Sequence, residues 1–232
     1  MTHLDLQYAF ELEANSIDSY VTTKLTSTDI LHWLNTAVDK FIKTRFDGDN
    51  PTKKSFEQNE KRSRDLVGLL STKLYHVGEI TSSRKGFDIY SIVYPTDLMF
   101  VVDEAVDIAC KNGDETKYWP AEIFECTLDN YMYRITNKLT DFHLRNDYAR
   151  PIRVRTKDGC NLFTDGNYNI DTYTVTYIRI PEQISLDDPF KEYTDLPEFA
   201  LREIVKIAVQ MYFASINDPR YNVVNNENNN ME

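Results

Sequence analysis

Apolar and polar residues follow the period of an α-helix in the first third of the chain. Residues 26–46 carry apolar side chains three and four positions apart, which predicts a helix with one buried face. Thr26 and Asp29 have the spacing of a capping box at its start, and the segment 47–51, with its Gly and Pro, ends it.

Two further helices are expected on either side of this one. Residues 55–70 predict a helix with interleaved charges and an apolar end. Residues 4–15 predict a short helix whose apolar side carries Leu4, Tyr8, Leu12 and Phe10.

The period then changes from that of a helix to that of a strand. Runs rich in β-branched and aromatic residues predict strands at 74–77, 87–93, 98–110, 151–155 and 171–180. The turn residues between the last two runs indicate a hairpin with a long tip. Residues 121–137 have helical periodicity and predict a helix within this region.

The last expected element is a helix that runs to about residue 214. Asp195 as a cap, Pro197 in the first turn and Glu198 as an early acid mark its start. Its broad apolar stripe must be covered by the chain itself or by a neighbour. We therefore expect the stripe to form part of the core and part of it to meet a neighbouring subunit. The candidate residues are Ile204, Val205, Ala208 and Met211.

Helices and strands are segregated along the chain, which favours an α+β fold. We expect a single domain over residues 1–218, in which helical parts (1–72 and 190–216) flank an inserted antiparallel β wing (73–186). Residues 219–232 are rich in Asn and predict a disordered tail. This tail is expected to become ordered only in an assembly, where Tyr221, Val223 and Val224 are candidate contacts.

Composition adds constraints on function. The 232 residues carry a net charge of −11, and a negative field repels phosphate. Only 7 residues are Gly, and no phosphate-binding or catalytic motif of a common class is present. The three cysteines have no metal-binding spacing, and the start of the chain does not read as a signal peptide or a membrane span. We expect no cofactor and no metal.

Two charged clusters remain as candidate chemistry. Asp103, Glu104 and Asp107 offer the carboxylates that a divalent cation needs, so a metal-dependent hydrolase is the alternative from a different class. On a strand, however, Asp103 and Asp107 share one face and Glu104 points to the other. The second cluster is basic and suits docking to an acidic surface of a neighbouring subunit, with nucleic-acid binding as the competing interpretation; it contains Arg150, Arg153 and Arg155.

Several strings of residues together resemble a known family. They include Asp29-Ile30-Leu31-His32-Trp33-Leu34-Asn35, Tyr94-Pro95-Thr96-Asp97-Leu98-Met99-Phe100, Tyr177-Ile178-Arg179-Ile180-Pro181 and Glu203-Ile204-Val205-Lys206-Ile207-Ala208. In this order they resemble the head–tail connector, or ring, proteins of tailed bacteriophages, most closely those of crAss-like phages.

The resemblance implies a virion structural protein without catalytic activity. Proteins of this family assemble as homo-oligomeric rings, typically dodecamers, beneath the portal protein. Such a ring extends the channel through which genomic DNA passes and docks the next tail or ring protein. Another neck or tail ring, or a hub, is the nearest alternative. The implied location is the neck of the virion, after assembly in the cytoplasm of the host bacterium.

Overall fold

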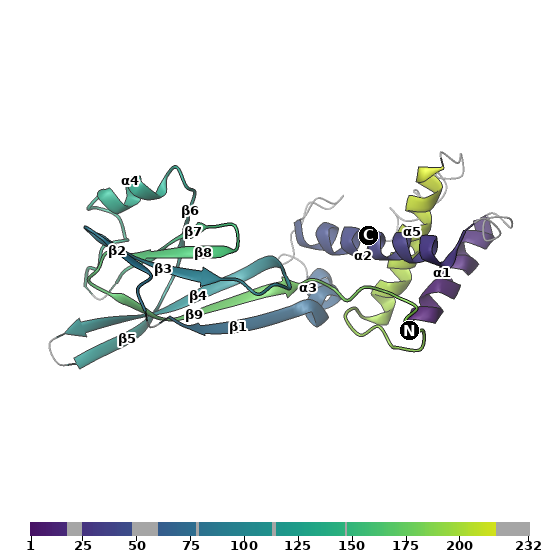
Figure 1. Ribbon diagram of the computed structural model, residues 1–232, viewed down its shortest axis with the longest axis horizontal. Coiled ribbons are helices and arrows are strands. Elements are labelled where there is room, and N and C mark those ends of the chain that lie inside the picture. Colours follow the sequence, from purple (N-terminus) through teal and green to yellow (C-terminus); the bar gives the residue numbers. More distant parts are fainter. Residues whose placement is uncertain (18–24, 48–59, 78, 113–114, 147, 217–232) are drawn as a thin grey trace. The chain divides into compact units, whose positions relative to one another are not determined.

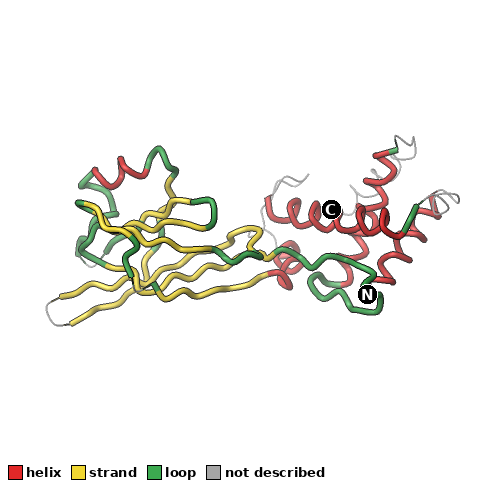
Figure 2. The backbone as a smooth tube through the Cα atoms, viewed as in Figure 1, coloured by secondary structure: helices red, strands yellow, loops and turns green. Residues whose placement is uncertain are grey.

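The computed structural model describes the chain except for residues 18–24, 48–59, 78, 113–114, 147 and 217–232. The chain forms two compact units. Residues 1–69 and 181–232 belong to a helical unit, and residues 70–180 belong to a strand unit inserted into it. Figure 2 shows most helices in one unit and the strands in the other, with the short helix 131–136 among the strands, which confirms the α+β class.

The helical unit contains α1 (His3–Ile17), α2 (Ser27–Asp47), α3 (Glu60–Leu66) and α5 (Glu198–Ser215) (Figure 1). The predicted capping box opens α2: the backbone N–H and hydroxyl of Thr26 both donate to the Asp29 carboxylate, at 3.1 and 2.6 Å. These hydrogen bonds lower the pKa of Asp29 below its ordinary value. The sequence interpretation of this helix is confirmed.

The buried face of α1 differs from the prediction. Leu6, Phe10 and Ala14 are fully buried, whereas Tyr8 and Leu12 are exposed. The Phe10 ring meets the Tyr212 ring of α5 edge-on at 6.4 Å. Of the residues assigned to the apolar side, only Phe10 belongs to this core face.

The predicted helix over 55–70 is also corrected at its end. Its first residues lie outside the described residues, and α3 stops at Leu66, followed by a 3₁₀ turn, η2 (Val67–Leu69). In this turn a Cβ on Gly68 would lie 2.5 Å from the backbone oxygen of Asp195. The close approach of the two backbones leaves no room for a side chain there.

The start of α5 uses different residues from those expected. Its N-cap is Pro197, whose side chain cannot cap, and the Asp195 carboxylate instead accepts the backbone N–H of Glu182 at 2.6 Å. Asp195 is 4% exposed, so it fastens the preceding loop instead of the helix.

The strand unit contains two sheets. The first is entirely antiparallel in the order β1-β9-β4-β5, made of β1 (Leu70–His76), β9 (Asn169–Arg179), β4 (Leu98–Asn112) and β5 (Glu115–Ala121). The second has the order β2-β3-β8-β7-β6, from β2 (Ser82–Arg84), β3 (Phe87–Val93), β8 (Gly159–Thr164), β7 (Ile152–Arg155) and β6 (Phe124–Cys126).

Residues from both sheets share one hydrophobic core. Val106, Tyr173 and Val175 of the first sheet cluster with Tyr90 and Leu162 of the second. The unit is therefore a packed pair of sheets, with a single parallel pairing, β6 with β7, among its described strands.

Two predictions in this region are wrong. The expected helix over 121–137 is instead the end of β5, the strand β6 and a short helix, α4 (Tyr131–Thr136). The expected hairpin of 151–155 with 171–180 does not form, because β7 pairs with β8 in one sheet and β9 pairs with β1 and β4 in the other.

Candidate interaction surfaces

A buried ion pair lies at the centre of the basic cluster. The Arg153 Nη2 atom lies 2.7 Å from a carboxylate oxygen of Glu104, and their side chains are 4% and 8% exposed. β7 positions Arg153 between Ile152 and Val154, which are also buried. An arginine inside an apolar strand needs a buried counter-charge. This position of Arg153 could have indicated a buried acidic partner, but the sequence interpretation did not assign one.

Two tyrosine hydroxyls complete the surroundings of Glu104. The Tyr94 hydroxyl donates to its Oε1 atom at 3.0 Å, and the Tyr173 hydroxyl donates to the same atom. Burial raises the pKa of both phenols, so each stays neutral and remains a donor. Glu104 is thus held by one cation and two hydroxyls inside the unit.

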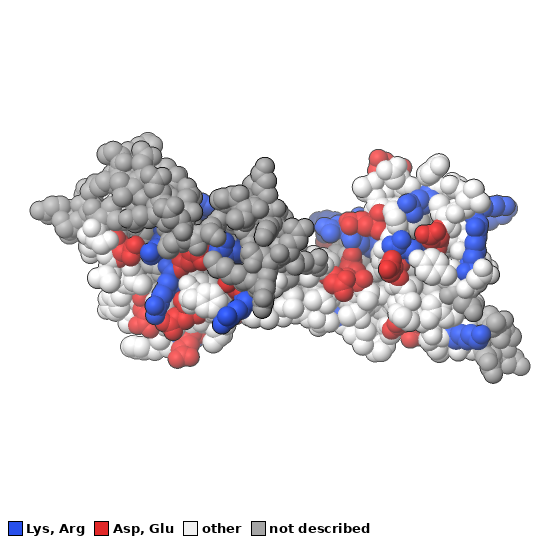
Figure 3. All heavy atoms as spheres, turned by 180° about the vertical axis from the view of Figure 1, so that it is seen from behind, with Lys and Arg blue, Asp and Glu red and all other residues white. Residues whose placement is uncertain are grey.

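The other two arginines are also paired within the chain. Arg150 contacts Glu122 at 3.0 Å, and the Arg155 Nε atom lies 3.5 Å from Glu125, which also reaches Arg153 at 3.2 Å. The structure therefore brings the three arginines together with acids of their own unit. Figure 3 shows positive and negative side chains interspersed on the face that it draws.

A shallow polar groove of about 250 Å³ lies against this cluster. Glu104, Glu125, Arg153 and Arg155 line it, together with Asp103. Acids and bases are mixed in its wall, so it offers no single-sign surface for a phosphate backbone.

The acidic residues Asp103, Glu104 and Asp107 are divided between the two faces of β4, as the alternation of side chains along a strand predicted. Asp103 and Asp107 are exposed, while Glu104 lies on the core side with Val106. Asp107 accepts the Thr172 hydroxyl at 2.7 Å. In the part of the chain that the structure describes, no group of three or more His, Cys, Asp or Glu side chains is arranged to hold a metal ion.

The apolar stripe of α5 lies inside the helical unit. Ile204, Val205 and Ala208 are buried, and Met211 is partly buried. Their contribution to the core is plain, and their contribution to a subunit interface stays a prediction. Tyr221, Val223 and Val224 lie outside the described residues.

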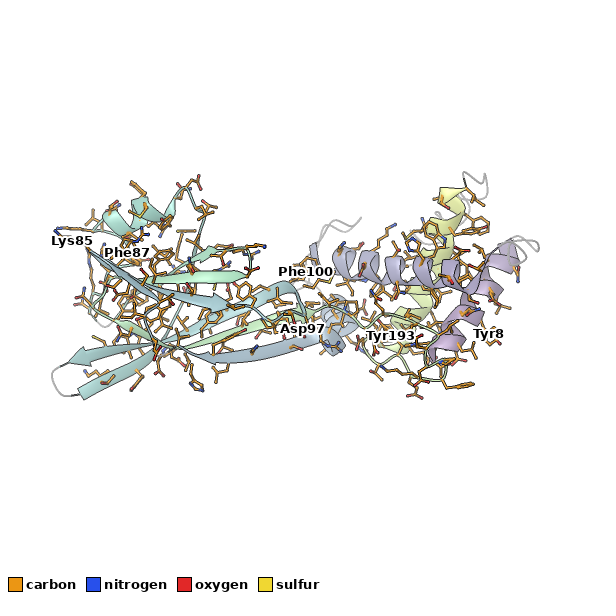
Figure 4. All side chains as sticks on the ribbon, in the orientation of Figure 1. Tyr8, Lys85, Phe87, Asp97, Phe100 and Tyr193 are labelled. Carbon is orange, nitrogen blue, oxygen red and sulfur yellow. The ribbon has the colours of Figure 1, made fainter. Side chains whose placement is uncertain are left out.

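Exposed apolar side chains occur elsewhere, and two of them, Tyr8 and Leu12, were assigned to the apolar side of the first helix. Tyr8 and Leu12 lie one helical turn apart on the outer side of α1 (Figure 4 labels Tyr8). A second group lies on α4 and in the chain before and after it, here called the surroundings of α4, and consists of Leu128, Met132, Tyr133, Leu139 and Tyr148. Groups of exposed apolar residues of this kind are typical of protein–protein contacts.

None of the described helices is both long enough and apolar enough to cross a membrane. A family model described as phage tail ring protein 3/4 matches residues 1–215, and thus extends over both units. No curated protein matches the chain.

Proposed function

Because the chain belongs to the phage tail ring protein 3/4 family of crAss-like phages, we propose that it forms a dodecameric ring at the head–tail junction, beneath the portal protein. The family match over residues 1–215 carries this proposal. A ring protein of the tail is a structural component of the virion that associates with its own copies and with other tail components. The position beneath the portal and the ring size are the parts that we add.

In this proposal the ring extends the DNA channel and docks the next tail or ring protein. The net charge of −11 supports it, because attraction to phosphates would slow DNA that must pass freely. The internal pairing of Arg150, Arg153 and Arg155 supports it further, since these cations are already neutralised by acids of the same unit. In this proposal the protein acts through the shape of the ring and its contacts, and it needs no catalytic residue.

The exposed apolar groups are the surfaces that such an assembly would cover. A ring is built from heterologous contacts, in which one surface of a copy meets a different surface of the next. The outer side of α1 and the surroundings of α4 belong to different units of the chain. Each is available for a neighbouring copy, the portal protein or the next tail component.

Quantitative mass spectrometry of purified, DNA-filled particles tests the proposal, with copy numbers scaled to the major capsid protein. We expect a fixed number near that of one dodecameric ring. Cross-linking of the same particles should join this chain to the portal protein. Cross-links to lower tail components alone would favour another neck or tail ring, or a hub. Absence from particles would refute a virion role.

The alternative from a different class, a metal-dependent hydrolase, has its own test. It requires Asp103, Glu104 and Asp107 to act on one cation, although Glu104 lies on the opposite face of β4. A titration with Mg²⁺ or Mn²⁺ should give the same result for the parent chain and for Asp103→Asn with Asp107→Asn. Cation binding that this double variant abolishes would support the hydrolase.

A further inference from the structure

The first sheet of the strand unit ends in two strands that each have one partner. In the order β1-β9-β4-β5, β1 pairs with β9 and β5 pairs with β4, and neither has a second neighbour among the described residues. An unpaired edge presents a row of backbone N–H and C=O groups that another strand can bind. These two edges are available to a neighbouring molecule.

The hydrogen bonds of β1 show which of its residues face outwards. The backbone N–H of Val77 donates to the carbonyl oxygen of Asp171, on the side of β9, at 2.8 Å. Backbone groups of successive residues in a strand point to opposite sides. The backbone groups of Thr72, Leu74 and His76 therefore point away from β9, towards the open edge.

A proline shows which backbone groups of β5 face the open edge. Pro120 has no N–H group and is tolerated in an edge strand when its nitrogen faces away from the partner strand. With Pro120 facing outwards, the same alternation directs the backbone groups of Tyr118 and Thr116 outwards too. Both edges thus present backbone groups at every second residue. On β5, Pro120 presents its carbonyl oxygen alone, so the N–H donors of this edge come from Tyr118 and Thr116.

The direction of the strands allows the two edges to meet. Each strand of this sheet is antiparallel to its neighbour, so β1 and β5 run in opposite directions in a sheet of four strands. When copies are repeated head to tail around an axis, β5 of one copy then lies antiparallel to β1 of the next. The sheet can continue from copy to copy without any change of orientation.

We propose that β1 of one copy pairs with β5 of the next copy, with Leu74 opposite Tyr118. This inference rests on the proposed ring and names one contact that builds it. Leu74 and Tyr118 are 53% and 61% exposed in the single chain and cover one another in this register. Thr72 then lies opposite Pro120, and His76 lies opposite Thr116.

The other face of the joined sheet supports the same register. It places Lys73 opposite Trp119 and Tyr75 opposite Lys117, so that each lysine meets an aromatic ring. A shift of two residues would instead place Lys73 opposite Lys117, and the repulsion of like charges disfavours it. A shift of two residues in the other direction removes two residue pairs from the ladder.

The stagger of the two edges also suits a closed ring of strands. Within one sheet, Lys73 and Glu104 of β4 both pair with Val175, so Lys73 is level with Glu104. Trp119, which lies opposite Lys73 of the next copy, pairs with Ile108, four residues further along β4. At ~3.3 Å per residue this is an offset of ~13 Å for a sheet of four strands that is ~19 Å wide. The corresponding tilt of ~35° lies at the lower end of the range that closed sheets adopt.

Cysteine cross-linking tests the contact directly in the full chain. The variant carries Leu74→Cys and Tyr118→Cys, with Cys110→Ser to remove the half-exposed native thiol. Within one chain the two positions are three strand spacings apart across the sheet, ~14 Å, and four residues apart along the strands, ~13 Å. The resulting separation of ~19 Å is too far for a disulfide. Mild oxidation should therefore give a ladder of covalent oligomers that disappears on reduction.

The control variant carries Leu74→Cys with Tyr133→Cys, another exposed tyrosine of the same unit, in the same Cys110→Ser background. It should remain without the ladder. Rings seen by electron microscopy without cross-links between 74 and 118 would overturn the β1–β5 contact and leave the ring proposal intact. A chain that forms no ring, and is absent from particles, would refute the proposed function and this contact with it.

A proline variant gives a second, independent measurement. Leu74→Pro removes an N–H that faces the open edge, so the pairing with β9 should survive and the melting temperature should change little. Lys73→Pro removes an N–H on the side of β9 and should lower the melting temperature. Pro120 leaves only a pair near the end of the ladder without one hydrogen bond, whereas Leu74 lies at its centre. We therefore expect Leu74→Pro to abolish rings in a folded protein, and rings that persist would contradict the inference.

Discussion

At the residue scale, the basic cluster shows how burial changes the meaning of a charge. Arg153 and Arg155 are two positions apart on β7, yet one side chain is 4% exposed and the other 61% exposed. The first is required to neutralise Glu104 inside the unit. The second is held only in a solvent-exposed pair, where the ion pair has little effect on stability.

Substitution of these two arginines should therefore have very different effects. Arg153→Ala leaves the Glu104 carboxylate buried without its cation, and we expect a loss of ~3–5 kcal/mol in the free energy of unfolding. Arg155→Ala should cost less than ~1 kcal/mol. Urea denaturation of both variants measures the difference, and equal losses would contradict the assigned role of Arg153.

A second prediction concerns the buried tyrosines. Burial raises the pKa of Tyr173 well above its ordinary value of 10.0, so the folded state holds this proton more tightly than the unfolded state. Its contribution to the free energy of unfolding is fully present below pH 10. It is lost as the pH rises further, because only the unfolded chain then releases the proton.

We therefore expect the free energy of unfolding to fall above pH 10, by up to ~1.4 kcal/mol per pH unit for this phenol. Tyr173→Phe should make the fall less steep, although it also removes a hydrogen bond to Glu104 at every pH. Tyr118→Phe, at an exposed position, is the matched control. Equal slopes for the two variants would refute the effect of burial.

At the scale of elements, the periodicity of the sequence predicted most helices and strands but not which strands pair with one another. The strand 87–93 and the helix that starts with Thr26 and Asp29 were predicted with nearly their observed bounds, because local hydrogen bonds and alternation determine them. The pairing of β9 with β1 was not predictable in the same way, since it joins residues a hundred positions apart, as in Leu74 with Thr174.

The candidate surfaces were predictable only in part. The outward direction of Asp103 and Asp107 followed from strand alternation. Tyr8 and Leu12 were assigned to the core, because two stripes at spacings of four exist on α1 and hydrophobicity alone does not choose between them. The observed core face also buries His3 and Gln7, which makes it look less apolar than it is.

The two faces of α1 can be distinguished by a matched pair of substitutions. Phe10→Ala should lower the free energy of unfolding by ~3–5 kcal/mol, because it opens a cavity against α5. Leu12→Ala should change it by no more than ~0.5 kcal/mol. Thermal and urea unfolding measure both, and the opposite order would restore the face that the sequence suggested.

At the scale of the whole molecule, the end of the chain should serve assembly and not folding. Truncation after Asp218 removes residues beyond the last described helix, which ends at Ser215. We expect an unchanged melting temperature and weaker ring formation, measured by calorimetry and by native mass spectrometry. A large loss of melting temperature would show that the tail belongs to the core.

The insertion of the strand unit has a consequence for how such proteins diversify. β1 opens the unit and β9 closes it, and Leu70 pairs with Ile178, so the chain enters and leaves at neighbouring strand ends. A single genetic exchange with breakpoints near codons 69 and 181 can therefore replace the whole unit as a cassette. Phage lineages that recombine can in this way acquire a new strand unit while they keep the two flanking segments of the gene that encode the helical unit.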